Sequence, residues 1–460
     1  MCDRPRDPRQ TQGVTAFIDE LIVGMVNLRI YGQRHPRVQS VLEQLERKLR
    51  YLTPPGKESL VLGLAEGYLI HEGRPLLDAS LSAPRLIHAL EEMGCSGIRF
   101  DRETDQSGFI VLLMALEEGR KRKWTPSQTE SELRLKGCET IFLLEQGSFD
   151  ETTGLEEKDR TVGVAMPAEI PIRLYQDVIE QLQTLSVDVC RGNQIDIAPA
   201  KDQISTILKQ LHRDNKSLMR LALYESYDAF TFGHSIRVCF LALNHARHLT
   251  DDEDVLESIG LAALLHDVGK VHVPFEILHS QTRLTAEERR EMEKHTWYGA
   301  QVLLELDEPE PMAVASAMGH HRTLDGGGYP QLVKGVPITA ATRLIKIADV
   351  YEALTAVRPY KDSMSPQRAY RIMFSMKGHF DPVLLKHFIL SSGVYPAGSW
   401  VELSDGRHAQ VEEQSGILLR PILSFEDEDE EYRLDLSESE EDLQVLRVLS
   451  TDEVANRIAG

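Results

Sequence analysis

Two adjacent histidines open a glycine-rich segment in the second half of the chain. This segment, HHRTLDGGGYP, runs from His320 to Pro330, and three glycines follow Asp325. Imidazole nitrogens are common metal ligands, and successive glycines let the backbone turn sharply and approach a ligand closely. The segment therefore predicts a metal-binding or substrate-binding loop, with a plain tight turn as the alternative.

Five more candidate metal ligands stand in the same part of the chain. They are His234 in FGHSIRV, His266 and Asp267 in LLHDVGK, His295 in EKHTWYG and Asp349 in KIADVYEALT. A lone imidazole in a helical domain is more often an ordinary hydrogen-bonded residue, so the prediction rests on the group. Burying Asp267 unpaired would be costly, whereas its carboxylate can bridge two cations. Imidazoles combined with carboxylates suit Fe, Mn, Co, Ni or Zn better than Mg or Ca.

These candidate ligands lie in a stretch with the pattern of an all-helical domain. Between residues 225 and 392, apolar residues recur at helical spacing in nearly every segment. Helix starts are predicted at Thr285 with Glu288, at Ser365 with Pro366, and at either Asp254 or Ser258. His266 and Asp267 follow the apolar run 261–265, so a buried helix is expected to deliver both side chains at its end.

The N-terminal part of the chain predicts a separate, smaller domain. Residues 1–13 are polar and expected to be disordered, whereas residues 14–150 alternate between helical and strand patterns. This pattern predicts a small α/β domain, for which a sensory or dimerising role is one interpretation. Residues 151–170 predict a linker, and residues 171–224 predict connecting helices that either relay a signal or complete a helical core.

The C-terminal part predicts a small appendage and a tail. Residues 393–425 contain short alternating runs around Asp405 and Gly406, which predict a β appendage with a hairpin turn. Residues 426–460 are rich in acidic side chains and are expected to form a largely disordered tail. The predicted fold class is therefore multidomain, with an all-α helical bundle between a small α/β domain and a small β appendage.

The composition of the chain indicates which binding partners and which cellular compartment to expect. A net charge of −21 makes DNA an unsuitable partner, because DNA binding requires a basic face. The sequence has no apolar run of about 18 residues and no leader pattern, so neither a membrane span nor a secretory signal is expected. The five cysteines form no CxxC pair, which fits a reducing compartment and argues against a thiolate zinc site. A cytoplasmic protein is expected.

The motifs, taken together, resemble the HD-GYP family of metal-dependent phosphohydrolases. The matching segments are HD, HH-x3-DGxGYP, ADVYEALT and RPY, in the same order and spacing, over about residues 225–392. The resemblance implies a bacterial enzyme that hydrolyses cyclic di-GMP with two divalent metal ions, most often Fe or Mn. It implies that one ion is held by His234, His266, Asp267 and Asp349, and that Asp267 bridges to a second ion held by His295, His320 and His321. Two cations about 4 Å apart can activate a shared water and stabilise charge on both the attacking and the leaving oxygen.

The resemblance also assigns the residues that contact substrate. The implied contacts to phosphate or nucleotide come from Lys270, Arg358, Lys361, Gly327 and Tyr329. A guanidinium matches the geometry of phosphate well. The alternatives are a solvent-facing lysine at position 270, surface ion pairs of Arg358 and Lys361 with residues such as Glu352, and a plain turn at the glycines. The loop could also bind a signalling protein.

The sequence departs from the family pattern at four positions. Arg322 replaces the usual acidic residue after the paired histidines and is expected to add positive charge beside the metals. Phe230 stands where some members have a glutamate for a third metal, so two metals are expected. Thr296 replaces a proline, and Glu352 replaces a common aspartate near the substrate. These changes keep open an alternative from another class, a weakly active or inactive cyclic-dinucleotide receptor or scaffold, and a homodimer is also left open.

Overall fold

The chain has two compact units. The computed structural model describes residues 8–65, 67–145, 172–223, 232–278, 280, 282–331, 336–356, 364–395, 397–415, 417–426, 431–439 and 443–449. The first unit comprises residues 1–168 and 172–193, and the second comprises residues 169–171 and 194–460. The linker predicted at 151–170 lies outside the described residues.

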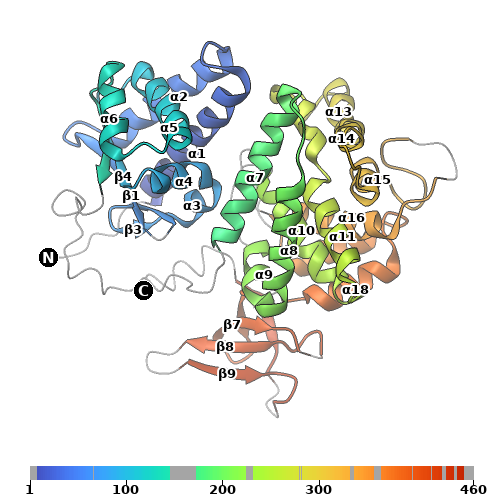
Figure 1. Ribbon diagram of the computed structural model, residues 1–460. Helices are drawn as coiled ribbons and strands as arrows, with labels where there is room; N and C mark the ends of the chain where they lie inside the picture. Colours follow the sequence, from blue (N-terminus) through green and yellow to red (C-terminus); the bar gives the residue numbers. More distant parts are fainter. Residues whose placement is uncertain are drawn as a thin grey trace. The chain divides into compact units, whose positions relative to one another are not determined.

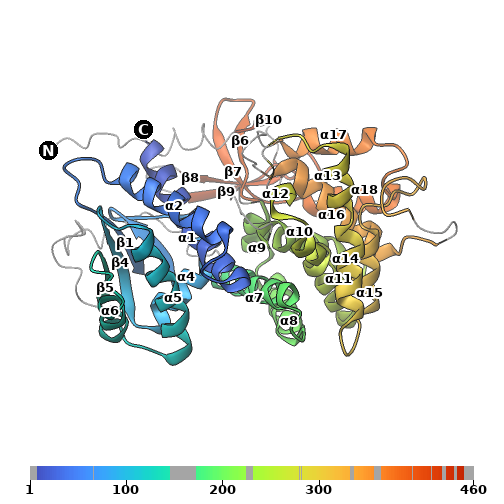
Figure 2. The same cartoon turned by 90° about the horizontal axis from the view of Figure 1, so that it is seen from above.

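The first unit is a five-stranded antiparallel sheet with helices packed on it. The strands, in the spatial order β3-β2-β1-β4-β5, are β1 (Ser59–Ala65), β2 (Tyr68–His71), β3 (Arg74–Pro75), β4 (Cys95–Asp101) and β5 (Ile141–Glu145). The helices are α1 (Pro8–Tyr31), α2 (Pro36–Leu52), α3 (Leu77–Ser82), α4 (Pro84–Glu92), α5 (Gln106–Arg122) and α6 (Pro126–Leu135). Helices α1 and α5 lie against the sheet (Figure 2), and Phe17 meets Phe100 edge-on with ring centroids 5.2 Å apart. The expected small α/β fold is confirmed, but α1 begins at Pro8, inside the stretch expected to be disordered.

Helix α7 (Ile172–Arg191) belongs to this first unit, although a connecting helix was expected there. The buried Gln176 donates from Nε2 to the carbonyl oxygens of Gly67 at 3.0 Å and Ser80 at 2.8 Å. On the same helix, Glu180 accepts from His88 Nδ1 at 2.5 Å and pairs with Arg120. The partners are polar and far away in sequence, so apolar periodicity alone could not reveal them.

The helical part of the second unit consists of eleven α-helices and one 3-10 helix in the described residues. They are α8 (Ala198–Arg213), α9 (Asn215–Leu223), α10 (Phe232–Ala246), α11 (Glu253–Leu265), η2 (Val268–His272), α12 (Phe275–Leu278), α13 (Ala286–Glu293), α14 (His295–Leu304), α15 (Pro311–Gly319), α16 (Ala340–Thr355), α17 (Pro366–Ser375) and α18 (Pro382–Ser392). Helix α10 is buried along 233–246, as expected of a helix with apolar residues on all sides. It packs against α11 and α16, and α11 packs against α15 (Figure 1). The predicted all-α domain is confirmed.

Helix starts in this unit follow the predicted capping chemistry, with one exception. Thr285 forms the predicted capping box, and the Ser365 side chain caps α17. Helix α11 is capped instead by Asp252, whose carboxylate accepts from a backbone amide three residues later. Asp254 and Ser258 lie inside that helix, so the predicted cap there is wrong.

The C-terminal sheet is larger than the predicted appendage. Its antiparallel strands, in the spatial order β10-β6-β7-β8-β9, are β6 (Trp400–Leu403), β7 (His408–Glu413), β8 (Ile422–Glu426), β9 (Glu431–Asp435) and β10 (Val445–Val448). Strands β9 and β10 fall inside 426–460, so the prediction of a largely disordered tail is wrong for these segments. Leu436 and Leu443 are buried in the core of this sheet, which the acidic composition concealed. No described helix has the length and apolar character needed to span a membrane.

Candidate metal centre

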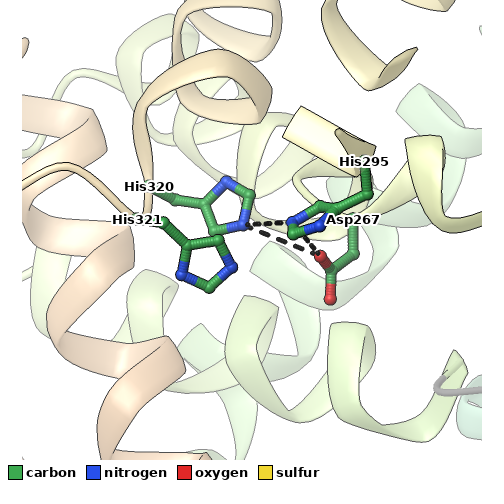
Figure 3. Close-up of side chains that lie close together, drawn as sticks. All are labelled: Asp267, His295, His320 and His321. Atoms are coloured by element: carbon green, nitrogen blue, oxygen red, sulfur yellow. Dashed lines mark hydrogen bonds and ion pairs between the residues drawn. The ribbon is translucent and has the colours of Figure 1, made fainter. Parts of the chain in front are cut away.

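The predicted ligands gather in two groups that share one carboxylate. The first group, whose potential ligand atoms all lie within 4.8 Å of one another, consists of Asp267, His295, His320 and His321 (Figure 3). The second group, under the same distance, consists of His234, His266 and Asp267. Asp349 adjoins the second group, with Oδ1 3.3 Å from His234 Nε2. The structure thus brings together all seven predicted ligands, which are up to 115 positions apart in sequence.

The ends of helices place most of these side chains. His266 directly follows α11, His320 directly follows α15, and His295 is the first residue of α14. A Cβ added at Gly269 would lie 2.0 Å from the carbonyl oxygen of His295 and 2.3 Å from the amide nitrogen of Gly299. Only a glycine allows this close approach of η2 to α14, which brings His295 beside the carboxylate that follows α11.

Backbone carbonyls fix the orientation of three imidazoles. Each Nδ1 lies at hydrogen-bond distance from a carbonyl oxygen one turn earlier, at 2.7 Å for His266, 2.6 Å for His295 and 3.0 Å for His320. A carbonyl can only accept, so Nδ1 carries the proton and Nε2 keeps its lone pair in the neutral ring. The Nε2 atoms of His295 and His320 then face each other 3.3 Å apart.

These donor atoms fit divalent cations. His266 Nε2 and Asp267 Oδ1 are buried and have no hydrogen-bond partner among the described residues. Asp267 Oδ1 also lies 3.5 Å from His295 Nε2 and 3.7 Å from His320 Nε2. Buried lone pairs that face one another are costly unless a cation lies between them. A donor set of imidazole and carboxylate without thiolates suits Fe, Mn, Co, Ni or Zn.

The charge states of the cluster suit metal binding. Burial acts to raise the pKa of Asp267, but the Lys270 ammonium and His266 outweigh burial and hold this pKa below normal. Burial also acts to raise the pKa of Asp349, but the neighbouring imidazoles outweigh it and hold this pKa below normal. Burial lowers the pKa of His321 to about 3 and that of His320 well below its usual value. The carboxylates are therefore anionic and these imidazoles neutral, as metal ligands must be.

His234 is oriented by a side chain rather than by a carbonyl. Its Nδ1 lies 2.5 Å from Glu352 Oε2, and Arg237 Nε donates to Glu352 Oε1 at 2.7 Å. Burial acts to lower the pKa of His234, but the carboxylates of Glu352 and Asp349 outweigh it and raise the pKa to about 9 in the absence of metal. Glu352 is only 2% exposed. It was expected near the substrate or in a surface ion pair, and the structure places it behind His234 instead.

Of the basic residues predicted to contact the substrate phosphates, the structure describes Lys270 alone. Lys270 lies in η2, and its ammonium pairs with Asp267, so its side chain faces the cluster rather than solvent alone. Its side chain is 20% exposed, which leaves it accessible to a phosphate at the cluster. Arg358 and Lys361 lie outside the described residues.

The glycine-rich loop folds back over the paired histidines. The Tyr329 ring lies over the His321 ring, with centroids 4.5 Å apart. Gly328 has φ +74°, and a Cβ there would lie 2.1 Å from the carbonyl oxygen of His321. Asp325 Oδ1 accepts from the amide of Gly327 at 3.1 Å, which closes the turn. Burial raises the pKa of Tyr329, so its hydroxyl stays protonated.

Comparison with known proteins identifies the helical domain. Residues 219–384 match the family model described as an HD domain. Over 229 residues the chain is 36% identical to the cyclic di-GMP phosphodiesterase PA4108 of Pseudomonas aeruginosa, covering 50% of this chain and 55% of that protein. The chain contains an HD domain over these residues.

Two further similar proteins cover a smaller share of this chain. The 3'3'-cGAMP-specific phosphodiesterase 1 of Vibrio cholerae is 34% identical over 157 residues, 34% of this chain and 36% of that protein. The solved structure of Bd1817, an HDGYP protein of Bdellovibrio bacteriovorus, aligns with a TM-score of 0.41 at 18% identity over 49% of this chain and 73% of that chain. The chain thus spans 55% of the length of the first relative and 36% of the second.

The described residues that depart from the expected family pattern make local hydrogen bonds. Arg322 Nη2 donates to the carbonyl oxygen of Val336 at 3.1 Å, so its guanidinium links the start of the connection between α15 and α16 to a residue near its end. The charge of Arg322 was expected beside the metals, but this hydrogen bond joins its guanidinium to a backbone carbonyl instead. Thr296 is buried, and its hydroxyl donates to the carbonyl oxygen of Glu293 at 3.0 Å at the start of α14. Phe230 lies outside the described residues.

Two polar residues escaped the sequence prediction. Arg237 was not considered, and Glu352 was assigned to the substrate. Helical spacing offered a signal for both, because Arg237 stands three positions after His234 and Glu352 three positions after Asp349. Each is therefore on the same helix face as a predicted ligand.

Proposed function

We propose that this chain is a metal-dependent phosphodiesterase that hydrolyses cyclic di-GMP. The observation that carries the proposal is the pair of ligand groups joined by Asp267. The names of the relatives support a cyclic-dinucleotide substrate for an HD-GYP domain of this kind. A paired site of this composition suits in-line displacement at a phosphodiester.

In this proposal, the chain's own residues divide the work. Two divalent cations, Fe or Mn, would supply Lewis-acid activation of a water and of the phosphodiester. Asp267 would contact both ions, and the imidazoles would hold them through Nε2. Lys270 would leave Asp267 and bind a phosphate oxygen. Tyr329 would shield His321 from bulk water and border the substrate, and Gly327 would let the loop approach it.

The reaction balances as a hydrolysis. The oxygen of water adds to phosphorus, one P–O ester bond breaks, and the leaving ribose oxygen gains a proton. The first product is a linear dinucleotide, and a second round would give the mononucleotide. Arg358 and Lys361 are proposed to bind the nucleotide phosphates, where a guanidinium and an ammonium offer complementary charge.

We also propose a cytoplasmic location. Cys138 and Cys239 are buried and form no disulfide, which suits a reducing compartment. We further propose that the glycine-rich loop binds a signalling protein and that the chain forms a homodimer. The net charge of −21 continues to argue against DNA as a partner.

The test is a product assay with defined metals. Protein loaded with Mn²⁺ or Fe²⁺ is incubated with cyclic di-GMP, and in parallel with 3'3'-cGAMP, and the products are resolved by chromatography. We expect the linear dinucleotide or GMP from cyclic di-GMP. Measurable binding of cyclic di-GMP without any product from either substrate would reject the hydrolase and favour the receptor.

A further inference from the structure

One metal ligand depends on a side chain for its orientation. His266, His295 and His320 hydrogen-bond to carbonyl oxygens of their own helical turns, which substitution cannot remove. His234 Nδ1 instead lies 2.5 Å from Glu352 Oε2, on a helix 118 positions away in sequence. The orientation of His234 therefore depends on a residue that can be changed.

Glu352 is itself held in place. Arg237 Nε donates to its Oε1 at 2.7 Å, and Arg237 Nη2 lies 2.6 Å from the same oxygen. The Arg237 and Glu352 side chains are 7% and 2% exposed. A buried, paired carboxylate has little freedom to rotate, so Oε2 stays directed at His234.

This geometry sets the tautomer of His234. A carboxylate can only accept, so the neutral imidazole carries its proton on Nδ1 and keeps a lone pair on Nε2. That Nε2 lies 3.3 Å from Asp349 Oδ1 and 3.6 Å from Asp267 Oδ2. The lone pair thus meets two other predicted ligands, and the carboxylate behind the ring increases its strength as a donor.

We propose that Glu352, with Arg237 as its charge partner, is a positioning residue that sets the affinity of one of the two metal positions by orienting His234. The affected position is the one formed by His234, His266, Asp267 and Asp349. The position formed with His295, His320 and His321 does not depend on Glu352. The inference rests on the proposed metal-dependent function and adds a determinant of metal affinity to it.

The test measures Mn²⁺ binding alone. Equilibrium dialysis with elemental analysis gives the number and affinity of bound Mn²⁺ ions in the full chain. The double variant Arg237→Met/Glu352→Leu removes both buried charges together, so no unpaired charge remains to unfold the domain. We expect one Mn²⁺ to bind 10- to 100-fold more weakly and the other to be retained, since loss of such a partner typically costs that much.

A second variant and a matched control secure the result. Glu352→Gln keeps the shape but offers a weaker acceptor, so a smaller loss at the same single position is expected. The control is Arg85→Met/Glu117→Leu in the first unit, where Arg85 Nε lies 2.7 Å from Glu117 Oε1 in another little-exposed pair. It should leave both Mn²⁺ affinities unchanged.

Two outcomes separate this inference from the proposed function. Binding of both Mn²⁺ ions with unchanged affinity in a folded Glu352 variant would overturn the positioning role, whatever the activity of the parent protein. If the parent protein binds two Mn²⁺ ions but hydrolyses no cyclic dinucleotide, the proposed function fails, and loss of one ion on changing Glu352 still supports the positioning role. Circular dichroism of the metal-free variants verifies that they are folded.

Discussion

At the scale of single residues, Asp267 is the point where the two ligand groups meet. Its two oxygens contact different partners, with Oδ1 near His295 and His320 and Oδ2 near His234 and His266. A carboxylate placed in this way can hold one cation on each side. Its loss should therefore affect both metal positions, unlike the loss of Glu352.

Asp267→Ala is expected to remove both metal ions and to abolish hydrolysis together. The variant lacks the one ligand common to both groups, and the remaining imidazoles in each group hold a cation weakly without its charge. Elemental analysis after dialysis checks the metal content. Asp325→Asn, in the glycine-rich loop outside the cluster, is the control. Unchanged metal content in Asp267→Ala would rule out the bridging assignment.

Lys270→Ala is expected to keep the metals and slow turnover by about tenfold or more. The ammonium contributes charge at the phosphate rather than a metal bond, and a tenfold loss corresponds to about 1.4 kcal/mol of transition-state stabilisation. Metal analysis and kcat on the same preparation separate these effects. Loss of metal in parallel with activity would show that Lys270 supports the cluster instead.

The types and spacing of residues were enough to predict the seven ligands but not what lies behind them. The order of the motifs indicated which histidines and aspartates converge, because each ligand stands in a short segment that resembles a motif of the family. The contact between His234 and Glu352 joins α10 to α16, and only the packing of those two helices reveals it. The same limit explains why Glu352 was assigned to the substrate.

At the scale of elements, the ends of helices and the loop between α15 and α16 shape the site. Gly326 and Gly328 both have positive φ, at +88° and +74°. A Cβ at Gly326 meets nothing within 4 Å, whereas a Cβ at Gly328 would lie 2.1 Å from the carbonyl oxygen of His321. The two glycines thus share a positive φ that strains other residues, and they differ in the space available for a Cβ.

Gly328→Ala is expected to reduce kcat by at least about tenfold, because the clash must displace either Tyr329 or the backbone of His321. Gly326→Ala is the matched control and carries only the left-handed backbone cost of about 1–2 kcal/mol. We expect it to change kcat by less than about threefold, on a rate scale where tenfold is 1.4 kcal/mol. Equal effects of the two substitutions on the rate of product formation would show that the close approach at Gly328 does not matter for catalysis.

Element types were predictable where apolar periodicity is strong, and failed where charge or polar contacts decide. Helix α10 and the sheet of the first unit follow from their apolar residues. Strands β9 and β10 were missed because acidic residues dominate the segment around them, from 426 to 442, although Leu434 and Val445 pack against the sheet core. The cap of α11 was misplaced because four consecutive acidic residues, 251–254, stand at the start of the helix.

At the scale of the whole molecule, the chain consists of two units, and α7 is fastened to the first by charge. Burial acts to raise the pKa of Glu180, but hydrogen bonds from His88 and Arg120 outweigh it and lower the pKa to about 2, below the usual 4.5. A carboxyl with a lowered pKa stabilises the folded state above pH 4.5, and this contribution is lost as the pH falls toward 2.

Glu180→Gln is therefore expected to lower stability at pH 7 by on the order of 2 kcal/mol. The difference from the parent protein should shrink at pH 3, where the unfolded chain already carries a protonated Glu180. Thermal unfolding of both proteins at the two pH values checks this. A difference that is the same at pH 7 and pH 3 would contradict the charged role of Glu180.

The central claim is that side chains from five segments of the second unit hold two metal ions through a shared Asp267. Crystals of the full chain grown with Mn²⁺, and measured for anomalous scattering, test it most directly. The account predicts two anomalous peaks on either side of Asp267, each about 2 Å from the nitrogen and oxygen atoms of its group. A single peak, or peaks that Asp267 does not join, would contradict it.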